Sequence, residues 1–173
     1  VDPDPDFKFP QKQLINFLEQ SIPNCDAVIV SDYGKGLLSS ATLKAISACG
    51  KKNNIPVVGD PRNTTNYKIY KNFTLIKPNR KEAEAAAGFK FKDEKDILKA
   101  AKILKTELEV KYLIFSLDKD GLLLFSSPQD YHFVAAETQE VFDVVGAGDT
   151  VSSVLTFMLA GKAKIEQAVY WAQ

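Results

Sequence analysis

The chain has 173 residues and is 45% hydrophobic, which suits the core of one domain or of a large part of one. Lysine plus arginine total 22 and aspartate plus glutamate total 22, so the formal net charge is zero. This balance gives no electrostatic reason to expect nucleic acid or an anionic membrane as a partner. No apolar run reaches membrane-spanning length, and the first residues do not resemble a signal peptide.

The cysteine and histidine content limits which disulfides and metal sites the chain can form. Cys25 and Cys49 have no CxxC spacing, which favours a reducing compartment over a disulfide scaffold, and we expect a cytoplasmic protein. The single histidine, His132, excludes a zinc site that needs two or more histidines. Residues 1–6 are extended and acidic, and residues 165–173 follow a helical pattern without a stop signal, so we expect a fragment.

Predicted strands and helices alternate for most of the chain. Strands are expected at residues 26–31, 55–58, 73–76 and 112–117, followed by a meander at 122–125 and 131–134. Helices are expected at residues 11–22, 40–52, 80–87 and 94–108, and from Gly148 to Gly161, with Ser40, Asn79 and Asp93 as candidate caps. The alternation predicts an α/β fold with a mainly parallel sheet covered on both faces.

Polar loops follow the predicted strands. They cover residues 32–36, 60–62, 77–82, 116–121 and 143–149. In open α/β sheets, ligands bind outside the carboxyl ends of the strands. We therefore expect these loops to share one edge of the sheet.

The segment Gly146-Ala147-Gly148-Asp149 is the most informative of these loops. Glycines let backbone N–H groups approach an anion closely, and a helix N-terminus favours negative charge. An anion would repel Asp149, so the arrangement makes sense if Asp149 handles a proton while the backbone holds a transferring phosphate. The segment matches neither a Walker A loop nor a GxGxxG fingerprint. The alternative is an ordinary strand-to-helix turn with a capping aspartate.

Two further loops carry candidate ligands, each with a plainer alternative. Asn79 and Glu82 lie three residues apart on a first helical turn, where their oxygens would suit magnesium held through water. They also match an N-cap with a capping-box glutamate, which the pattern alone favours. Lys35, between Gly34 and Gly36, could reach a phosphate, or could be an exposed lysine of an ordinary loop.

Taken in order, these motifs resemble the PfkB (ribokinase-like) sugar kinases, and within them the D-glycero-β-D-manno-heptose 7-phosphate kinases. The residues that carry the resemblance are Ser31-Asp32-Tyr33-Gly34-Lys35-Gly36, Asp60-Pro61, Pro78-Asn79 with Glu82, and Asp143-Val144 with Gly146-Ala147-Gly148-Asp149. The match runs over nearly the whole chain. It implies a ribokinase-like three-layer αβα fold, with residues 1–173 as a partial kinase domain that lacks the N-terminal sugar-binding and lid part and the C-terminal end.

The resemblance also implies roles for individual residues. Asp149 would be the base that takes the proton from the sugar hydroxyl, and the N–H groups of Gly146, Ala147 and Gly148 would form the anion hole. Asn79 and Glu82 would hold Mg²⁺, Lys35 would lie near phosphate, and Ser116 and Gly121 would border the ATP. The product would be heptose 1,7-bisphosphate, an intermediate of ADP-heptose and lipopolysaccharide core synthesis. A homodimer is one form of assembly that the resemblance leaves open.

Four positions depart from the family pattern. They are Val145 in place of a threonine, Lys77 in place of a small hydroxyl residue, Arg62 in place of a lysine, and Asp118 in place of a glycine or serine. Two other functions therefore stay open. One is a PfkB kinase for another sugar or for a nucleoside, and the other is a non-catalytic nucleotide-binding relative.

Overall fold

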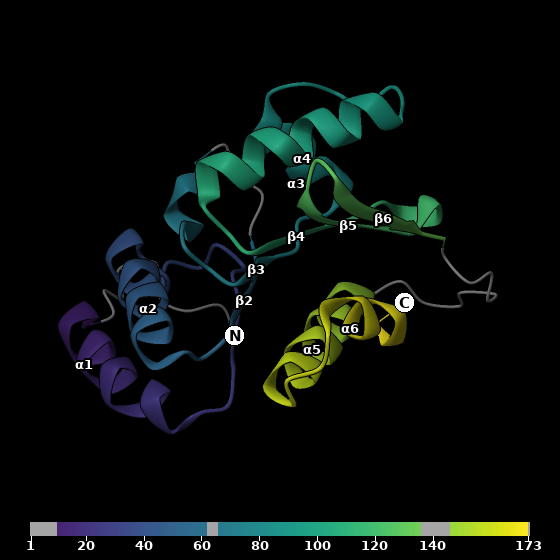
Figure 1. Ribbon diagram of the computed structural model, residues 1–173. Helices are drawn as coiled ribbons and strands as arrows, with labels where there is room; N and C mark the ends of the chain where they lie inside the picture. Colours follow the sequence, from purple (N-terminus) through teal and green to yellow (C-terminus); the bar gives the residue numbers. More distant parts are fainter. Residues whose placement is uncertain (1–9, 62–65, 136–145, 173) are drawn as a thin grey trace.

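A computed structural model describes residues 10–61, 66–135 and 146–172 of the chain (Figure 1). One six-stranded sheet runs through it in the order β1-β2-β3-β4-β5-β6. The strands are β1 (Val28–Ser31), β2 (Val57–Asp60), β3 (Leu75–Ile76), β4 (Tyr112–Ser116), β5 (Leu122–Ser127) and β6 (Asp130–Val134). Strands β1 to β4 pair in parallel, and β4, β5 and β6 pair antiparallel. The predicted α/β class and the closing meander are confirmed.

Helices cover both faces of the sheet, as the three-layer prediction requires. The α-helices are α1 (Gln11–Ser21), α2 (Ser40–Asn53), α3 (Arg80–Ala87), α4 (Glu94–Leu108), α5 (Ala147–Ala160) and α6 (Ile165–Trp171). Short 3₁₀ helices are η1 (Ile22–Asn24), η2 (Tyr67–Tyr70) and η3 (Asp118–Asp120). Figure 1 shows α1 to α4 on one side of the sheet and α5 with α6 on the other.

Alternation along each strand divides the core into two parts. Val58, Leu75 and Ile114 belong to the cluster that includes α5 and α6. Their neighbours Val57, Ile76 and Leu113 belong to the cluster that includes α2 and α4. Because successive side chains point to opposite faces, a strand buried on both faces is apolar at nearly every position. This explains the continuous apolar runs in the sequence.

Local hydrogen bonds set where the helices begin. Asn79 and Asp93 cap α3 and α4 as predicted, each accepting the backbone N–H of the third residue of its helix. The predicted cap of α2 was wrong by one residue. Ser39, in extended conformation, accepts the Thr42 N–H, and Ser40 is the first helical residue.

No helix in the described ranges combines the length and the apolar character needed to cross a bilayer. The predictions that concern Arg62, Val145 and the start of the segment 143–149 fall outside the described residues.

We expect Gly50→Ala to lower the free energy of unfolding by about 1–3 kcal/mol. An added Cβ on Gly50 would stand 2.4 Å from Val57 Cγ2 and 3.0 Å from the Ile55 carbonyl oxygen, so α2 would have to move away from β2. Elsewhere in a helix, glycine to alanine usually stabilises. Urea unfolding measures the change, and Lys51→Ala, at an exposed position of the same helix, is the neutral control. A more stable Gly50→Ala variant would contradict this packing.

Candidate active site

The start of helix α5 carries several backbone N–H donors. Gly146 has φ 86° and is the N-cap, so Ala147, Gly148 and Asp149 form the first turn. The first N–H groups of a helix have no acceptor within the helix, and the helix dipole adds positive potential there. Glycine adopts the left-handed conformation seen at Gly146 with little loss of free energy. The start of α5 is therefore suited to bind an anion such as phosphate.

Asp149 is exposed at this helix start and already accepts a hydrogen bond from a hydroxyl. The Tyr33 hydroxyl donates to Asp149 Oδ2 over 2.8 Å, across 116 residues of sequence. The contact brings the loop after β1 to the start of α5. A role for Asp149 as the proton acceptor stays a prediction. Sequence reasoning assigned Tyr33 no role, although it lies in a loop that the motif analysis singled out.

Two glycines and a buried aspartate shape that loop. Gly34 and Gly36 have φ 70° and 86°, and Lys35 lies exposed between them. Asp32 Oδ1 accepts the Gly34 N–H at 2.8 Å, and Asp32 Oδ2 accepts the Tyr70 hydroxyl at 2.6 Å. These bonds anchor the base of the loop to the protein. The turn that carries Lys35 is thus held at its base, and the phosphate-binding role of Lys35 stays a prediction.

Beneath α5, a buried ion pair joins two strands and the helix. Lys77 follows β3 and its side chain is 3% exposed, with Nζ 3.2 Å from Asp60 Oδ2 at the end of β2. The Ser152 hydroxyl of α5 donates to the same Asp60 oxygen over 2.7 Å. A Cβ placed on Gly148 would stand 3.6 Å from Lys77 Nζ. The departure from the family pattern at Lys77 thus lies near the predicted anion hole.

Asn79 and Glu82 form a complete capping box at the start of α3. Asn79 Oδ1 accepts the Glu82 N–H, and Glu82 Oε2 accepts the Asn79 N–H, both at 2.9 Å. The plainer alternative for this pair is therefore confirmed. Burial raises the pKa of the Glu82 carboxyl, with Asp60 acting in the same direction, while the Asn79 hydrogen bonds and Lys77 oppose it. Because burial makes the charged form of this carboxyl unfavourable, a nearby cation would stabilise that charged form.

The capping box is compatible with binding of Mg²⁺ by Asn79 and Glu82. Within the described residues there is no cluster of three or more histidine, cysteine, aspartate or glutamate residues suited to a metal. The buried Tyr67 hydroxyl has no hydrogen-bond partner among the described residues, and burial, then Glu82, raises its pKa. Such a group is usually satisfied by ordered water. Because Mg²⁺ keeps several waters and takes few protein ligands, this donor set fits it.

Ser116 and Gly121 border the loop that follows β4. Ser116 lies beside Asn79 in a parallel bridge and donates its N–H to the Pro78 carbonyl at 3.0 Å. Gly121, with φ 83°, ends η3, and the Leu117 N–H donates to its carbonyl at 2.8 Å. Of the two predicted nucleotide residues, Ser116 thus lies next to the capping box.

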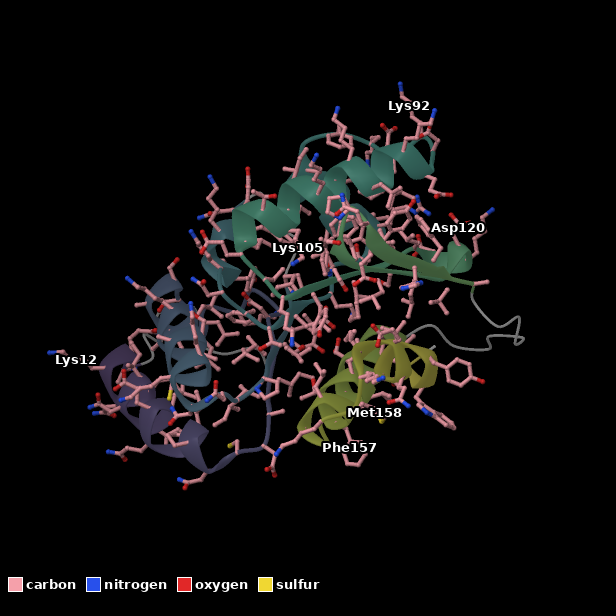
Figure 2. All side chains as sticks on the ribbon, viewed as in Figure 1. Lys12, Lys92, Lys105, Asp120, Phe157 and Met158 are labelled. Carbon is pink, nitrogen blue, oxygen red and sulfur yellow. The ribbon has the colours of Figure 1, made fainter. Side chains whose placement is uncertain are left out.

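Arg80 pairs with the two aspartates of this loop. Its guanidinium lies 2.5 Å from Asp120 Oδ2 and 3.7 Å from Asp118 Oδ2, and it donates to the Leu117 carbonyl. Figure 2 shows Asp120 at the end of the molecule where β4 and β5 meet. The charge of Asp118, which departs from the family pattern, is therefore partly compensated.

Two groups of predicted residues emerge from these contacts. Asp149 accepts a hydrogen bond from Tyr33 and Lys77 lies near Gly148, while Asn79 pairs with Ser116 in a β-bridge. Lys77 links the groups, since it also acts on the pKa of Glu82. The described residues thus supply an exposed carboxylate and a helix start at α5, and an amide with a carboxylate at the start of α3.

Comparison with known proteins agrees with this arrangement. Residues 4–173 match the model of the pfkB family carbohydrate kinases. Similar curated proteins include the bifunctional protein HldE of Campylobacter curvus, 41% identical over 94% of this chain, and that of Campylobacter concisus, 44% identical over 82%. The chain spans 34% and 29% of the lengths of these relatives.

Solved structures agree on the fold. Ribokinase of Arabidopsis thaliana, in complex with ribose and ATP, superposes on 89% of this chain with a TM-score of 0.77 at 18% identity, and 49% of that chain is covered. Escherichia coli phosphofructokinase-2, in complex with potassium, superposes on 91% with a TM-score of 0.76 at 23% identity, covering 52% of that chain. With the family match over almost its full length, the chain belongs to the pfkB family of carbohydrate kinases.

Proposed function

We propose that this chain is the catalytic part of an ATP-dependent sugar kinase that phosphorylates D-glycero-β-D-manno-heptose 7-phosphate to the 1,7-bisphosphate. The observation that carries the proposal is Asp149, exposed on the first turn of α5 and hydrogen-bonded to a hydroxyl. The similarity to HldE proteins at 41% and 44% identity supports the choice of a heptose phosphate.

The residues at the start of α5 divide the reaction between them. Asp149 accepts the proton of the sugar hydroxyl as its oxygen bonds to the γ-phosphorus of ATP. The bond from that phosphorus to the bridging oxygen breaks, and ADP leaves with the electron pair. The N–H groups of Gly146, Ala147 and Gly148 hold the oxygens of the transferring group. Loose phosphoryl transfer needs positioning and charge neutralisation more than a strong base, so a carboxylate is adequate.

Further residues hold the phosphates and the nucleotide. Lys35 reaches phosphate from the loop after β1, and Ser116 and Gly121 border the nucleotide at the loop after β4. Asn79 and Glu82 would hold Mg²⁺, largely through water, and the metal would neutralise charge on the phosphates.

A substrate panel tests the proposed function. The full natural protein carrying this sequence is incubated with Mg-ATP and heptose 7-phosphate, ribose, fructose 6-phosphate or a nucleoside, and ADP release is measured. We expect the highest kcat/KM with heptose 7-phosphate. A preference for another acceptor would assign the other sugar or nucleoside function, and ATP binding without ADP release would assign a nucleotide-binding relative.

Asp149→Asn should reduce kcat by about 10²–10⁴-fold, because the amide cannot accept the proton. The side chain is exposed, so the thermal unfolding temperature should stay close to that of the wild type. Tyr33→Phe is the matched control, since it removes the hydroxyl donor and keeps the carboxylate. Near-normal turnover by Asp149→Asn would remove Asp149 from the role of base.

Glu82→Gln separates the cap from the metal role. The amide oxygen can still accept the Asn79 N–H, so α3 keeps its cap, but a neutral side chain binds Mg²⁺ poorly. We expect the apparent Mg²⁺ affinity in the kinase assay to fall by about 10-fold or more. Unchanged Mg²⁺ dependence would leave Glu82 with the capping role alone.

The same variant should show a defined pH dependence of stability. The folded pKa of Glu82 is raised, so its stabilising contribution is present below the ordinary glutamate pKa and is lost as pH rises through the raised value. Without Mg²⁺, Glu82→Gln should therefore gain stability relative to wild type as pH rises above the ordinary glutamate pKa of about 4. Thermal unfolding measures the gain, and Lys81→Gln, exposed on the same helix, should show none of it.

A further inference from the structure

Arg80, the first residue of α3, contacts the loop between β4 and β5 at three places. Its guanidinium lies 2.5 Å from Asp120 Oδ2 and 3.7 Å from Asp118 Oδ2, and it donates to the Leu117 carbonyl over 3.4 Å. The Arg80 side chain is 23% exposed, whereas those of Asp118 and Asp120 are 75% and 56% exposed. One largely buried cation is therefore shared between two carboxylates that are open to solvent.

The backbone of this loop keeps the two aspartates close together. The Leu117 N–H donates to the Gly121 carbonyl over 2.8 Å, and the Asp120 N–H donates to the Leu117 carbonyl over 3.0 Å. Asp118 has φ 54°, a left-handed conformation that aspartate and asparagine adopt more readily than most residues. Because its own hydrogen bonds close the turn, two like charges lie in a small space, where they repel each other and any further anion.

The same loop follows the residue that pairs with the capping box. Ser116 forms a bridge with Asn79, and Asn79 directly precedes Arg80. In the proposed function, Ser116 and Gly121 border the nucleotide, whose phosphates are negatively charged. Without the Arg80 guanidinium, two unpaired carboxylates would stand beside that ligand and would disfavour its binding.

We propose that Arg80 is a positioning residue for the nucleotide, which neutralises Asp118 and Asp120 so that the loop after β4 admits the phosphates of ATP. This inference rests on the proposed function and extends it to a residue to which the sequence motifs assigned no role. Arg80 acts through the aspartates and need not touch the nucleotide. The alternative is a structural contact, in which Arg80 only keeps the shape of the loop through the Leu117 carbonyl.

ADP release by the full natural protein, with the acceptor that the substrate panel identifies, separates the two roles. Arg80→Met should raise the KM for Mg-ATP by about 10-fold with little change in kcat, because two carboxylates near the phosphates lose their counter-ion. The inhibition constant of adenosine, which lacks phosphates, should stay the same. The rise in KM should shrink to about 3-fold or less in about 0.5 M salt, which screens exposed charges. A purely structural contact predicts weaker binding of both ligands at every salt concentration.

Neutral aspartate variants provide the decisive control. Arg80→Met combined with Asp118→Asn and Asp120→Asn removes all three charges, and asparagine tolerates the backbone conformation of Asp118. This variant should return the KM for Mg-ATP to within about 3-fold of wild type. Asp118→Asn with Asp120→Asn alone should leave the KM unchanged or lower it by up to about 3-fold, since Arg80 then has no competing carboxylate.

Lys12→Met controls for the loss of one positive charge. Lys12 is exposed on α1, and Figure 2 shows it far from Asp120, so its replacement should change the KM for Mg-ATP by less than about 2-fold. An unchanged KM in Arg80→Met, or a rise that the two asparagines do not reverse, would overturn the role of Arg80. If the wild type releases no ADP with any acceptor, the proposed function fails and this inference fails with it. Wild-type turnover with an unaffected Arg80→Met overturns the inference alone.

Discussion

The parallel register of β1, β2, β3 and β4 is the constraint on which the site depends. It sets the carboxyl ends of these strands along one edge, with Val30 opposite Gly59 and Gly59 opposite Ile76. The polar residues that follow each strand are then neighbours, although they are far apart in the chain. A slip of one residue in β3 would turn Lys77 away from Asp60 and toward the opposite face of the sheet.

Helix α5 packs against β1 and β2 on the face of the sheet that carries Val58 and Leu75. Ser152 connects it to Asp60 on β2, and Asp149 connects it to Tyr33 in the loop after β1. Both bonds come from the first half of α5, whereas Phe157, further along, projects away from the sheet with its side chain 78% exposed (Figure 2). The donors at the helix start are thus held over the strand ends by polar contacts on two sides.

The departures from the family pattern take on a physical meaning in this arrangement. Asp118 looks unfavourable beside a nucleotide, but Arg80 holds both Asp118 and Asp120. Lys77 looks like a lost hydroxyl, but it adds a buried positive charge next to Gly148. In each case a neighbouring residue on another element changes what the side chain does.

Local sequence patterns predicted the order of the strands and helices and the caps at Asn79 and Asp93. They also predicted that Asp149, the candidate base, lies at the start of a helix. Periodicity, capping and glycine turns involve residues close together in the chain, so the sequence alone reveals them. They could not predict which side chains meet. The Tyr33 contact to Asp149 spans 116 residues, and the partnership of Lys77, Asp60 and Ser152 joins three elements. Only the folded structure shows these contacts, because they depend on the register of the strands and on how α5 packs against β1 and β2. No local sequence pattern encodes either.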